Sequence, residues 1–375
     1  RIYLYSGSKG LVSIRWDGTD EKAHLKVTGI MTYGSVAEEN NCLLVETASE
    51  PQREPSNAAY IRIAPEGDQA LAQINNDLYV VTVPKTGGET PKISVAEADK
   101  AQFPARKLTK IGGEFANWTA DAKTVYFSLG NAFFRYNLDS AKSSELALKQ
   151  KKAEEEKKKE EGKDEKKEEK KDEKKDESYK PFEIRVKVTV QKDIPAGKIL
   201  LQNARIITMK GEEILERGDV LIENARIKQV GAAGSFAVGA DVKKIDLTGK
   251  TIVPGFVDTH AHMWPAWGVH KNQVWLYAAN LAYGVTTTRD PQTSSTDVLT
   301  YGDMVETGQI IGPRIYSTGP GVGYWAYNLK DLEQTRDILK QYSESFHTKT
   351  IKMYLTGNRQ HRQWVIQAAR EPQLL

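Results

Sequence analysis

The first 140 or so residues alternate short apolar runs with polar turns, a pattern typical of antiparallel strands rather than helices. Two stretches share this pattern, namely IAPEGDQALAQINNDLYVVTV (63–83) and WTADAKTVYFSLGNAFFRYNL (118–138), and each reads turn, strand, turn, strand. A third, partial copy opens the chain as IYLYSGSKGLVSIRWDGTD. Such self-similarity predicts the blades of a β-propeller over residues 1–148, with a generic antiparallel sandwich as the alternative.

The stretch at residues 149–178 is almost entirely lysine, glutamate and aspartate. It has no aromatic or branched apolar side chain to bury against its conformational entropy, so we expect a solvated linker or loop with at most transient helix. Strand alternation resumes in FEIRVKVTV (182–190). The charged stretch is therefore predicted to interrupt a hairpin, with residues 179–194 as the last propeller strand or a connector.

The pattern changes twice more towards the end of the chain. Residues 195–254 contain two echoing hairpin pieces, ILLQNARIITM and VLIENARIKQVG, which predict a small β-sandwich. From residue 255, strand-like runs such as VTTTRD and TIKMYLTG alternate with helical patterns, which indicates βα units around a parallel sheet. Four strand–helix steps fit into 255–375, so the predicted fold is multidomain: a partial all-β propeller, a small β-sandwich and the first half of an α/β (β/α)8 TIM barrel.

Composition excludes several classes of protein. The net charge is only +3, with both signs mixed in the low-complexity stretch, so nucleic-acid binding is not indicated. The single cysteine, Cys42, rules out an internal disulfide framework, and no apolar run reaches the ~20 residues needed to span a membrane. The chain starts with RIYLYSG, without methionine, and stops just after a helical pattern. We therefore expect it to be a fragment of a longer protein.

The stretch TIVPGFVDTHAHMWP (251–265) ends a predicted strand with three polar side chains at alternate positions, Asp258, His260 and His262. Alternate residues of a strand point to one face, so the two imidazoles are expected to converge at the carboxyl end of the strand, where barrel active sites are built. Asp258, one step deeper, is expected to fix the ring orientation. The alternative is a pair of hydrogen-bonded structural histidines.

The motif PGFVDTHAH, after a small sandwich and before βα units, resembles the amidohydrolase superfamily of metal-dependent hydrolases, including imidazolonepropionase-like and prolidase-like members. The resemblance covers residues 195–375 and implies that His260 and His262 bind a divalent metal, usually Zn²⁺. It also implies that Lys352, in TIKMYLTG, becomes carboxylated and bridges two metals, so one or two ions are expected. The alternative is an inward Lys352 paired with a carboxylate such as Asp258. The phrases VSIRWDGTD and WTADAKTVYF resemble the TolB-type propeller repeat.

Further residues are assigned through the same resemblance. Arg289 and Asp290 would lie at the catalytic rim of the second barrel strand, and Tyr354 would line the substrate pocket beside Lys352. Arg359 and Arg362 follow the fourth strand, where their guanidinium groups could hold a substrate carboxylate.

The implied reaction is hydrolysis of a C–N bond in a small molecule or small peptide by metal-activated water. Two alternatives remain open: a lactonase or esterase on the same metal site, and a propeller-based envelope binding scaffold with a degenerate barrel. The superfamily's remaining histidine ligands and its catalytic aspartate would lie beyond residue 375. We therefore expect this polypeptide alone to be inactive and to bind metal poorly. A periplasmic or secreted location follows from the propeller resemblance, and a homo-oligomer is compatible with the sequence.

Overall fold

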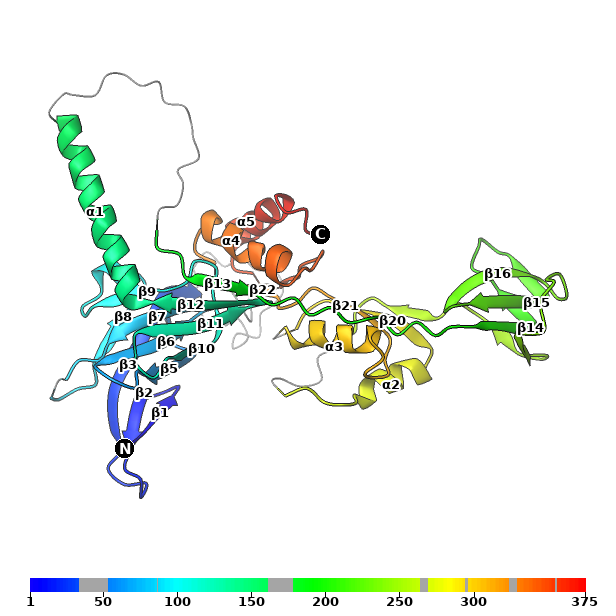
Figure 1. The fold of residues 1–375 in the computed structure, drawn as a ribbon, viewed down its shortest axis with the longest axis horizontal. Helices are drawn as coiled ribbons and strands as arrows, with labels where there is room; N and C mark the ends of the chain where they lie inside the picture. The colour runs from blue at the N-terminus through cyan, green and yellow to red at the C-terminus, as the bar shows by residue number, and fades with distance from the viewer. Residues whose placement is uncertain are drawn as a thin grey trace. The chain divides into compact units, whose positions relative to one another are not determined.

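The structure is a computed structural model that describes residues 1–33, 53–85, 87–160, 178–263, 269–293, 296–323, 329–354 and 356–375. The chain divides into two compact units (Figure 1). The first comprises Arg1–Lys187 together with Gly321–Leu375, and the second comprises Val188–Pro320. This division falls inside residues 255–375, which the sequence pattern had assigned to a single half-barrel.

Three largely antiparallel sheets form most of the first unit. The first sheet contains β1 (Ile2–Ser6), β2 (Gly10–Ile14), β3 (Lys22–Tyr33), β4 (Arg53–Asn57) and β8 (Lys92–Ser94), of which β8 pairs in parallel with β3. The second runs in the order β5 (Tyr60–Ile63), β6 (Gln69–Ile74), β7 (Asp77–Thr82) and β9 (Ala105–Lys107), with the 3-10 helix η1 (Ala98–Lys100) before β9. The third runs in the order β10 (Glu114–Trp118), β11 (Thr124–Leu129), β12 (Ala132–Asn137) and β13 (Phe182–Arg185).

Two-residue turns build the central hairpins of the second and third sheets. Ile74 pairs with Asp77 across one turn, and Leu129 pairs with Ala132 across the other. The first turn residues, Asn75 and Gly130, have φ values of 57° and 55°, the left-handed conformation that short hairpin turns use. These are the two similar stretches of the sequence, so the predicted strand–turn–strand repeat is confirmed. Over the residues that the structure describes, the sheets do not form a closed propeller, and the TolB-type resemblance stays a prediction.

The second sheet is buried on both faces because alternate residues of its strands enter different cores. On β6 and β7, Ala72 and Val81 pack with Leu25, Val27 and Ile93 of the first sheet. The neighbouring positions supply the other core, in which side chains of the second and third sheets pack together: Leu71, Leu78, Val80, Trp118, Val125 and Phe127. Because successive side chains of β6 and β7 point to opposite faces, the second sheet packs against the first sheet on one side and the third sheet on the other.

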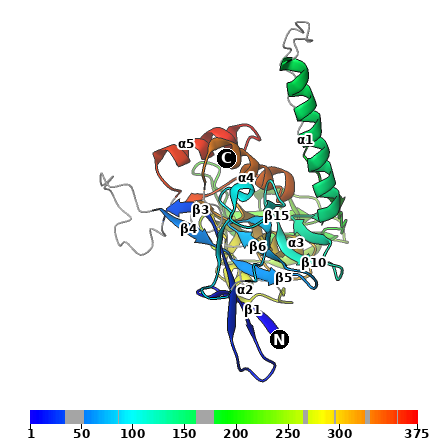
Figure 2. The same ribbon diagram turned by 90° about the vertical axis from the view of Figure 1, so that its left-hand side faces the viewer.

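The charged stretch differs in part from the prediction, because the helix α1 (Leu138–Glu160) follows β12 directly and includes its first residues (Figures 1 and 2). The start of α1 is stabilised by Asn137, whose side chain accepts a 2.8 Å hydrogen bond from the backbone N–H of Ser140, and by the buried Ala141. The first part of the charged stretch, up to Glu160, is therefore an ordered helix, where at most a transient helix was predicted. Beyond the insertion, β13 pairs antiparallel with β12, so the interrupted hairpin is confirmed.

The last part of the chain belongs to the first unit. It contains α4 (Leu332–Lys340), the π-helical turn η2 (Gln341–Ser345) and α5 (Arg359–Arg370), together with a parallel pair of short strands, β22 (Val322–Gly323) and β23 (Met353–Tyr354). The amide of Gln341 donates a hydrogen bond to the carbonyl of Ile111, which ties η2 to the β-sheets. The predicted fourth barrel strand corresponds to β23 and pairs with β22. Just before β23, the carbonyl oxygen of Lys352 accepts a 2.8 Å hydrogen bond from the backbone N–H of Val322.

The second unit begins with one mixed sheet rather than the predicted two-layer sandwich. Its order is β16 (Arg226–Ala232), β15 (Ile214–Glu223) and β14 (Lys198–Ile207), and both β17 (Lys243–Asp246) and β18 (Thr251–Ile252) pair in parallel with β14. The two echoing pieces of sequence supply β14 and β15, which pair antiparallel as predicted for hairpins. Their apolar positions form a small cluster around Ala204, Ile206 and Val220.

A parallel sheet of three strands, in the order β19 (Phe256–Asp258), β20 (Val285–Asp290) and β21 (Arg314–Ser317), completes the second unit. The helices α2 (Trp275–Ala282) and α3 (Asp297–Glu306) connect the strands and pack through Tyr277, Val298 and Tyr301. The βα alternation predicted from the sequence is confirmed over these three strands. In the described part of the chain, no helix is long and apolar enough to cross a membrane.

Candidate metal centre

The parallel sheet places polar side chains at one edge. Asp258, Asp290 and Ser317 are the last residues of β19, β20 and β21, and Asp290 pairs with Ser317 across the sheet. Carboxyl ends of parallel strands meet at the same edge, which is where active sites of βα folds lie. The chain that follows β19 carries the two histidines, so the predicted residues of the second unit gather at this edge.

The histidines themselves do not lie on the strand, which corrects the strand-face prediction. β19 stops at Asp258 because the Asp258 carboxylate accepts a 2.9 Å hydrogen bond from the backbone N–H of His260 and so turns the chain. His260 and His262 are nevertheless neighbours, with ring centroids 5.5 Å apart and ring planes at 77°. Asp258 acts on the backbone of His260 in the structure, and its predicted role in orienting an imidazole ring stays a prediction.

His262 has a defined orientation. Its Nδ1 atom lies 2.9 Å from the backbone carbonyl oxygen of Gln292, just after β20. A carbonyl oxygen can only accept, so Nδ1 carries the proton and Nε2 presents its lone pair. Metal-binding histidines in proteins are commonly fixed in this way, through the nitrogen that does not bind the metal. The side chain of His262 is half exposed, which leaves room for a ligand at Nε2.

Asp290 is fully buried beneath this histidine. Its carboxylate accepts hydrogen bonds from the backbone N–H groups of Gln292, at 3.0 Å, and Met263, at 3.3 Å, and one oxygen lies 3.7 Å from Nδ1 of His262. Burial raises the pKa of Asp290 to about 6, against the lowering effect of these hydrogen bonds and of His262. The carboxylate thus joins the chain after β19 to the chain after β20, whereas Arg289 is half-buried on the alternate face of β20.

A buried tyrosine supports the same stretch from the helix side. The hydroxyl of Tyr277, on α2, donates a 2.5 Å hydrogen bond to the backbone carbonyl of Met263. The sequence did not indicate Tyr277, and it did not indicate Gln292 because a backbone carbonyl leaves no mark in the residue type. Asp290 was expected at this rim, and its burial and its hydrogen bonds are what the structure adds.

The other predicted site residues lie in the first unit. Lys352 is half-buried, and its ammonium group lies 5.8 Å from the centre of the Tyr354 ring, so these two side chains share a face as predicted. Arg359 and Arg362 are exposed on the first turn of α5. The histidine pair belongs to the second unit, so a shared site with Lys352, Tyr354 and the two arginines stays a prediction.

These residues fit a zinc site in part. The rings of His260 and His262 lie side by side and could supply two of the four ligands that zinc usually takes. In His262, Nδ1 is held by the hydrogen bond to Gln292, which leaves Nε2 available to a metal. Among the residues that the structure describes, no group of three or more histidine, cysteine, aspartate or glutamate side chains is arranged to hold a metal. The pair therefore needs further donors to complete a coordination shell.

Known proteins resemble this chain over limited stretches, and no family model matches it. A dihydroorotase of Listeria welshimeri is 36% identical over 75 residues, which cover 20% of this chain and 16% of that protein. A 5-methylthioadenosine/S-adenosylhomocysteine deaminase of Desulforamulus reducens is 39% identical over 68 residues, which cover 18% of this chain and 16% of that protein. Among solved structures, phenylurea hydrolase B matches with a TM-score of 0.40 and 20% identity, over 47% of this chain and 54% of that one.

The matched stretch spans about a sixth of the length of these curated relatives. Within that limit, the sequence similarity supports the resemblance to the amidohydrolase superfamily, because the relatives are amidohydrolases, enzymes that act on C–N bonds.

Proposed function

We propose that the chain carries the first metal ligands of an amidohydrolase-superfamily enzyme that hydrolyses a C–N bond in an amide, a cyclic amide or a small peptide. The observation that carries this proposal is the adjacent pair of His260 and His262, with Nδ1 of His262 bonded to the carbonyl of Gln292. The similarity to a dihydroorotase and a deaminase supports the same reaction class.

His260 and His262 are the proposed ligands of a divalent metal, with Zn²⁺ the natural choice for imidazole donors. Zinc held by these two residues would supply a bound water with a pKa of about 7 and would polarise the carbonyl to be attacked. The chain's own residues hold the ligands in place: Asp258 fixes the backbone of His260, and Asp290 fixes the backbone on both sides of the His262 contact. Arg289 stays a proposed rim residue that faces the substrate.

Lys352 is proposed to serve, once its amine has taken up carbon dioxide, as a carboxylate ligand that would hold one or two metal ions. That reaction needs a neutral amine, and the Lys352 amine lies 5.8 Å from the centre of the Tyr354 ring. Arg359 and Arg362, both exposed, are proposed to hold a substrate carboxylate through their guanidinium groups.

Metal binding tests the histidine assignment directly. Cobalt(II) can replace zinc and reports its ligands by visible absorption, so titration of the protein is expected to give a spectrum that His262→Ala and His260→Ala each weaken, with affinity lower by roughly tenfold or more. His24→Ala is the matched control, because His24 lies in the first unit, bonded to Ser13 at 2.6 Å. Equal affinity in all four proteins would rule out the proposed ligands.

Substrate class needs a separate test. A cyclic amide, a dipeptide and a lactone, each offered as substrate to the protein supplied with zinc, distinguish the reaction types. Turnover of either C–N substrate supports the proposal. Turnover of the lactone alone would favour the lactonase alternative, and zinc binding without any turnover would favour a scaffold.

A further inference from the structure

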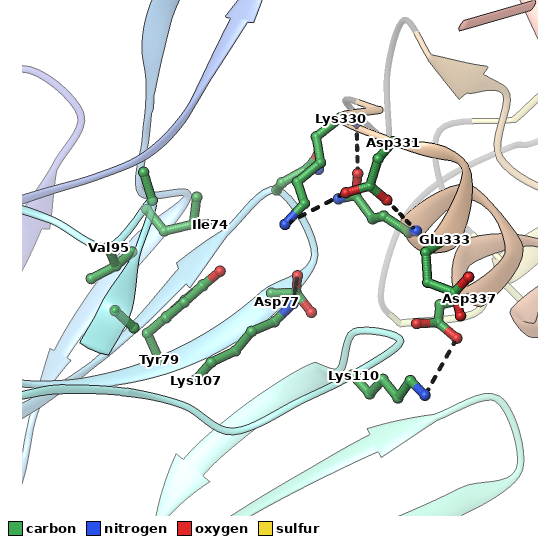
Figure 3. A pocket seen from close by; sticks show the side chains of 14 residues that line it. Ile74, Asp77, Tyr79, Val95, Lys107, Lys110, Lys330, Asp331, Glu333 and Asp337 are labelled. Carbon is green, nitrogen blue, oxygen red and sulfur yellow. Dashed lines mark hydrogen bonds and ion pairs between the residues drawn. The ribbon is translucent and has the colours of Figure 1, made fainter. Parts of the chain in front are cut away.

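A cavity of about 250 Å³ lies within the first unit, between the second sheet and the start of α4 (Figure 3). One wall is apolar and is formed by Ile74, Tyr79 and Val95. The opposite wall is charged and includes Lys330 and Asp337, from the segment that forms α4. Pockets for drug-sized ligands usually have about 300–1,000 Å³, so this cavity suits a smaller molecule.

Both signs of charge line the cavity (Figure 3). Lys107 and Asp77 form a close pair at 2.6 Å, and Thr109 also donates to the Asp77 carboxylate at 2.9 Å. This group is satisfied within the protein and serves as a fixed part of the wall. Burial raises the pKa of Asp77 even so, which shows that its carboxylate is largely withdrawn from water.

The ion pairs on the α4 side are longer. Lys330 lies 3.8 Å from the Asp331 carboxylate, and Asp337 lies 3.9 Å from Lys110 and 3.7 Å from Lys340. Distances beyond about 3.2 Å are too long for good hydrogen bonds, and pairs with exposed lysines contribute little to stability. The side chains of Lys330 and Lys110, which both line the cavity, are 56% and 61% exposed, so these charges can shift when a ligand enters at small cost.

Asp337 is a largely buried carboxylate whose ion pairs with Lys110 and Lys340 are both long. Its side chain is only 11% exposed, and burial raises the pKa of its carboxyl group against the lowering effect of Lys110 and Lys340. An additional cationic group at this wall would stabilise the carboxylate. Lys330, by contrast, offers an ammonium group that reaches towards the apolar wall (Figure 3).

We propose that this cavity binds a small zwitterion with an apolar side chain, such as a free amino acid or a short peptide. The ligand carboxylate lies at Lys330, its ammonium group lies at Asp337, and its side chain packs on Ile74, Tyr79 and Val95. Each charge of the zwitterion finds an opposite charge in the cavity, and the side chains that give up a long ion pair, Asp331, Lys110 and Lys340, are 45–61% exposed and can be hydrated instead. The cavity shares no residue with the proposed metal centre, and the two proposals stand or fall separately.

Calorimetric titration with L-leucine tests the proposal on the whole chain. Two analogues each lack one charge: isoamylamine has no carboxylate, and 4-methylpentanoate has no ammonium group. Each charged hydrogen bond is expected to contribute about a tenfold gain in affinity, so leucine should bind about tenfold more tightly than either analogue. Lys330→Met should weaken leucine and 4-methylpentanoate but spare isoamylamine, whereas Asp337→Asn should weaken leucine and isoamylamine.

Asp139→Asn is the matched control, because Asp139 on α1 also forms a 3.9 Å pair, with Lys123, but does not line the cavity. Its leucine affinity should equal that of the unmodified chain, and circular dichroism confirms folding of each variant. The proposal is overturned if leucine does not bind, if it binds no better than both analogues, or if Lys330→Met and Asp337→Asn leave its affinity unchanged.

Discussion

The Nδ1 atom of His262 lies 2.9 Å from the main-chain oxygen of Gln292. His262 follows β19 and Gln292 follows β20, so the chain after one strand orients a histidine ring that comes after the neighbouring strand. Asp290 makes this contact possible, because its buried carboxylate accepts backbone N–H groups from Gln292 and Met263 on either side. The ring orientation is therefore a property of two strand ends together. Changes at either end are expected to alter metal binding.

Zinc content is the first prediction. We expect this chain, after desalting, to retain less than one equivalent of zinc, because the two imidazoles supply only half of a usual zinc shell. Mass spectrometry of the metal content measures this. Stoichiometric zinc, lost again in His260→Ala, would show that further donors complete the site within this chain.

The pH dependence of stability is a second prediction, in protein stripped of metal by a chelator. Burial raises the pKa of Asp290 from 3.8 to about 6, so the folded state takes up a proton more readily than the unfolded state between these values. The stability that this group contributes is fully present below pH 3.8 and is lost as pH rises through 6. Two pKa units correspond to about 3 kcal/mol.

Urea unfolding at pH 4 and pH 7 measures this effect. The free energy of unfolding of the unmodified chain should fall by up to about 3 kcal/mol more than that of Asp290→Asn, which cannot ionise. Asp139→Asn, at an exposed position on α1, provides the comparison for general charge effects. An identical pH profile in the unmodified chain and in Asp290→Asn would mean that Asp290 does not titrate in this range.

A third prediction concerns the buried tyrosine of α2. Tyr277→Phe removes the hydroxyl that donates to the Met263 carbonyl and leaves that carbonyl without this partner, at a cost of about 1–3 kcal/mol. Metal affinity should fall as well, because Met263 adjoins His262. Tyr283→Phe is the control, since Tyr283 is 83% exposed. Unchanged stability in Tyr277→Phe would contradict the assigned hydrogen bond.

Two glycines of the parallel-sheet region should respond in opposite directions to alanine. Gly302 lies inside α3, and a Cβ atom there would meet Ile315 at an ordinary 3.6 Å, so Gly302→Ala should stabilise by about 0.5–1 kcal/mol. A Cβ at Gly255 would lie 2.2 Å from the Thr286 side chain, so Gly255→Ala should destabilise by about 1–3 kcal/mol. Thermal unfolding of both variants checks the pair, and equal shifts would contradict this packing.

Local patterns predicted much of the fold. The alternation around Leu71 and Val80 indicated the hairpin of β6 and β7. Of the four strand–helix steps predicted after residue 255, the parallel sheet contains three strands, β19, β20 and β21, joined by the two helices α2 and α3. The motif with His260 and His262 correctly indicated the carboxyl end of β19 as the place where these two histidines lie. Each of these features depends on residues close together in sequence, where period and turn chemistry act directly.

Long-range packing limited the rest. The pattern of α4 and α5 indicated helices, but not that the turn η2 after α4 would donate a hydrogen bond from Gln341 to Ile111, more than 200 residues away in sequence. β19 ends where the side chain of Asp258 accepts a hydrogen bond from the backbone N–H of His260. This turn takes His260 off the strand, although the alternation of residue types had predicted it to be part of the strand. The capping of α1 by Asn137 likewise favoured a helix where composition indicated a disordered run.

The insertion of residues 138–181 between β12 and β13 makes one edge pairing of the third sheet distant in sequence. Closing a flexible loop costs entropy that grows only with the logarithm of its length, by about 0.6 kcal/mol for each doubling. Evolution can therefore lengthen or trim this lysine- and glutamate-rich tract with almost no thermodynamic penalty on the Ala132–Arg185 pairing that it separates.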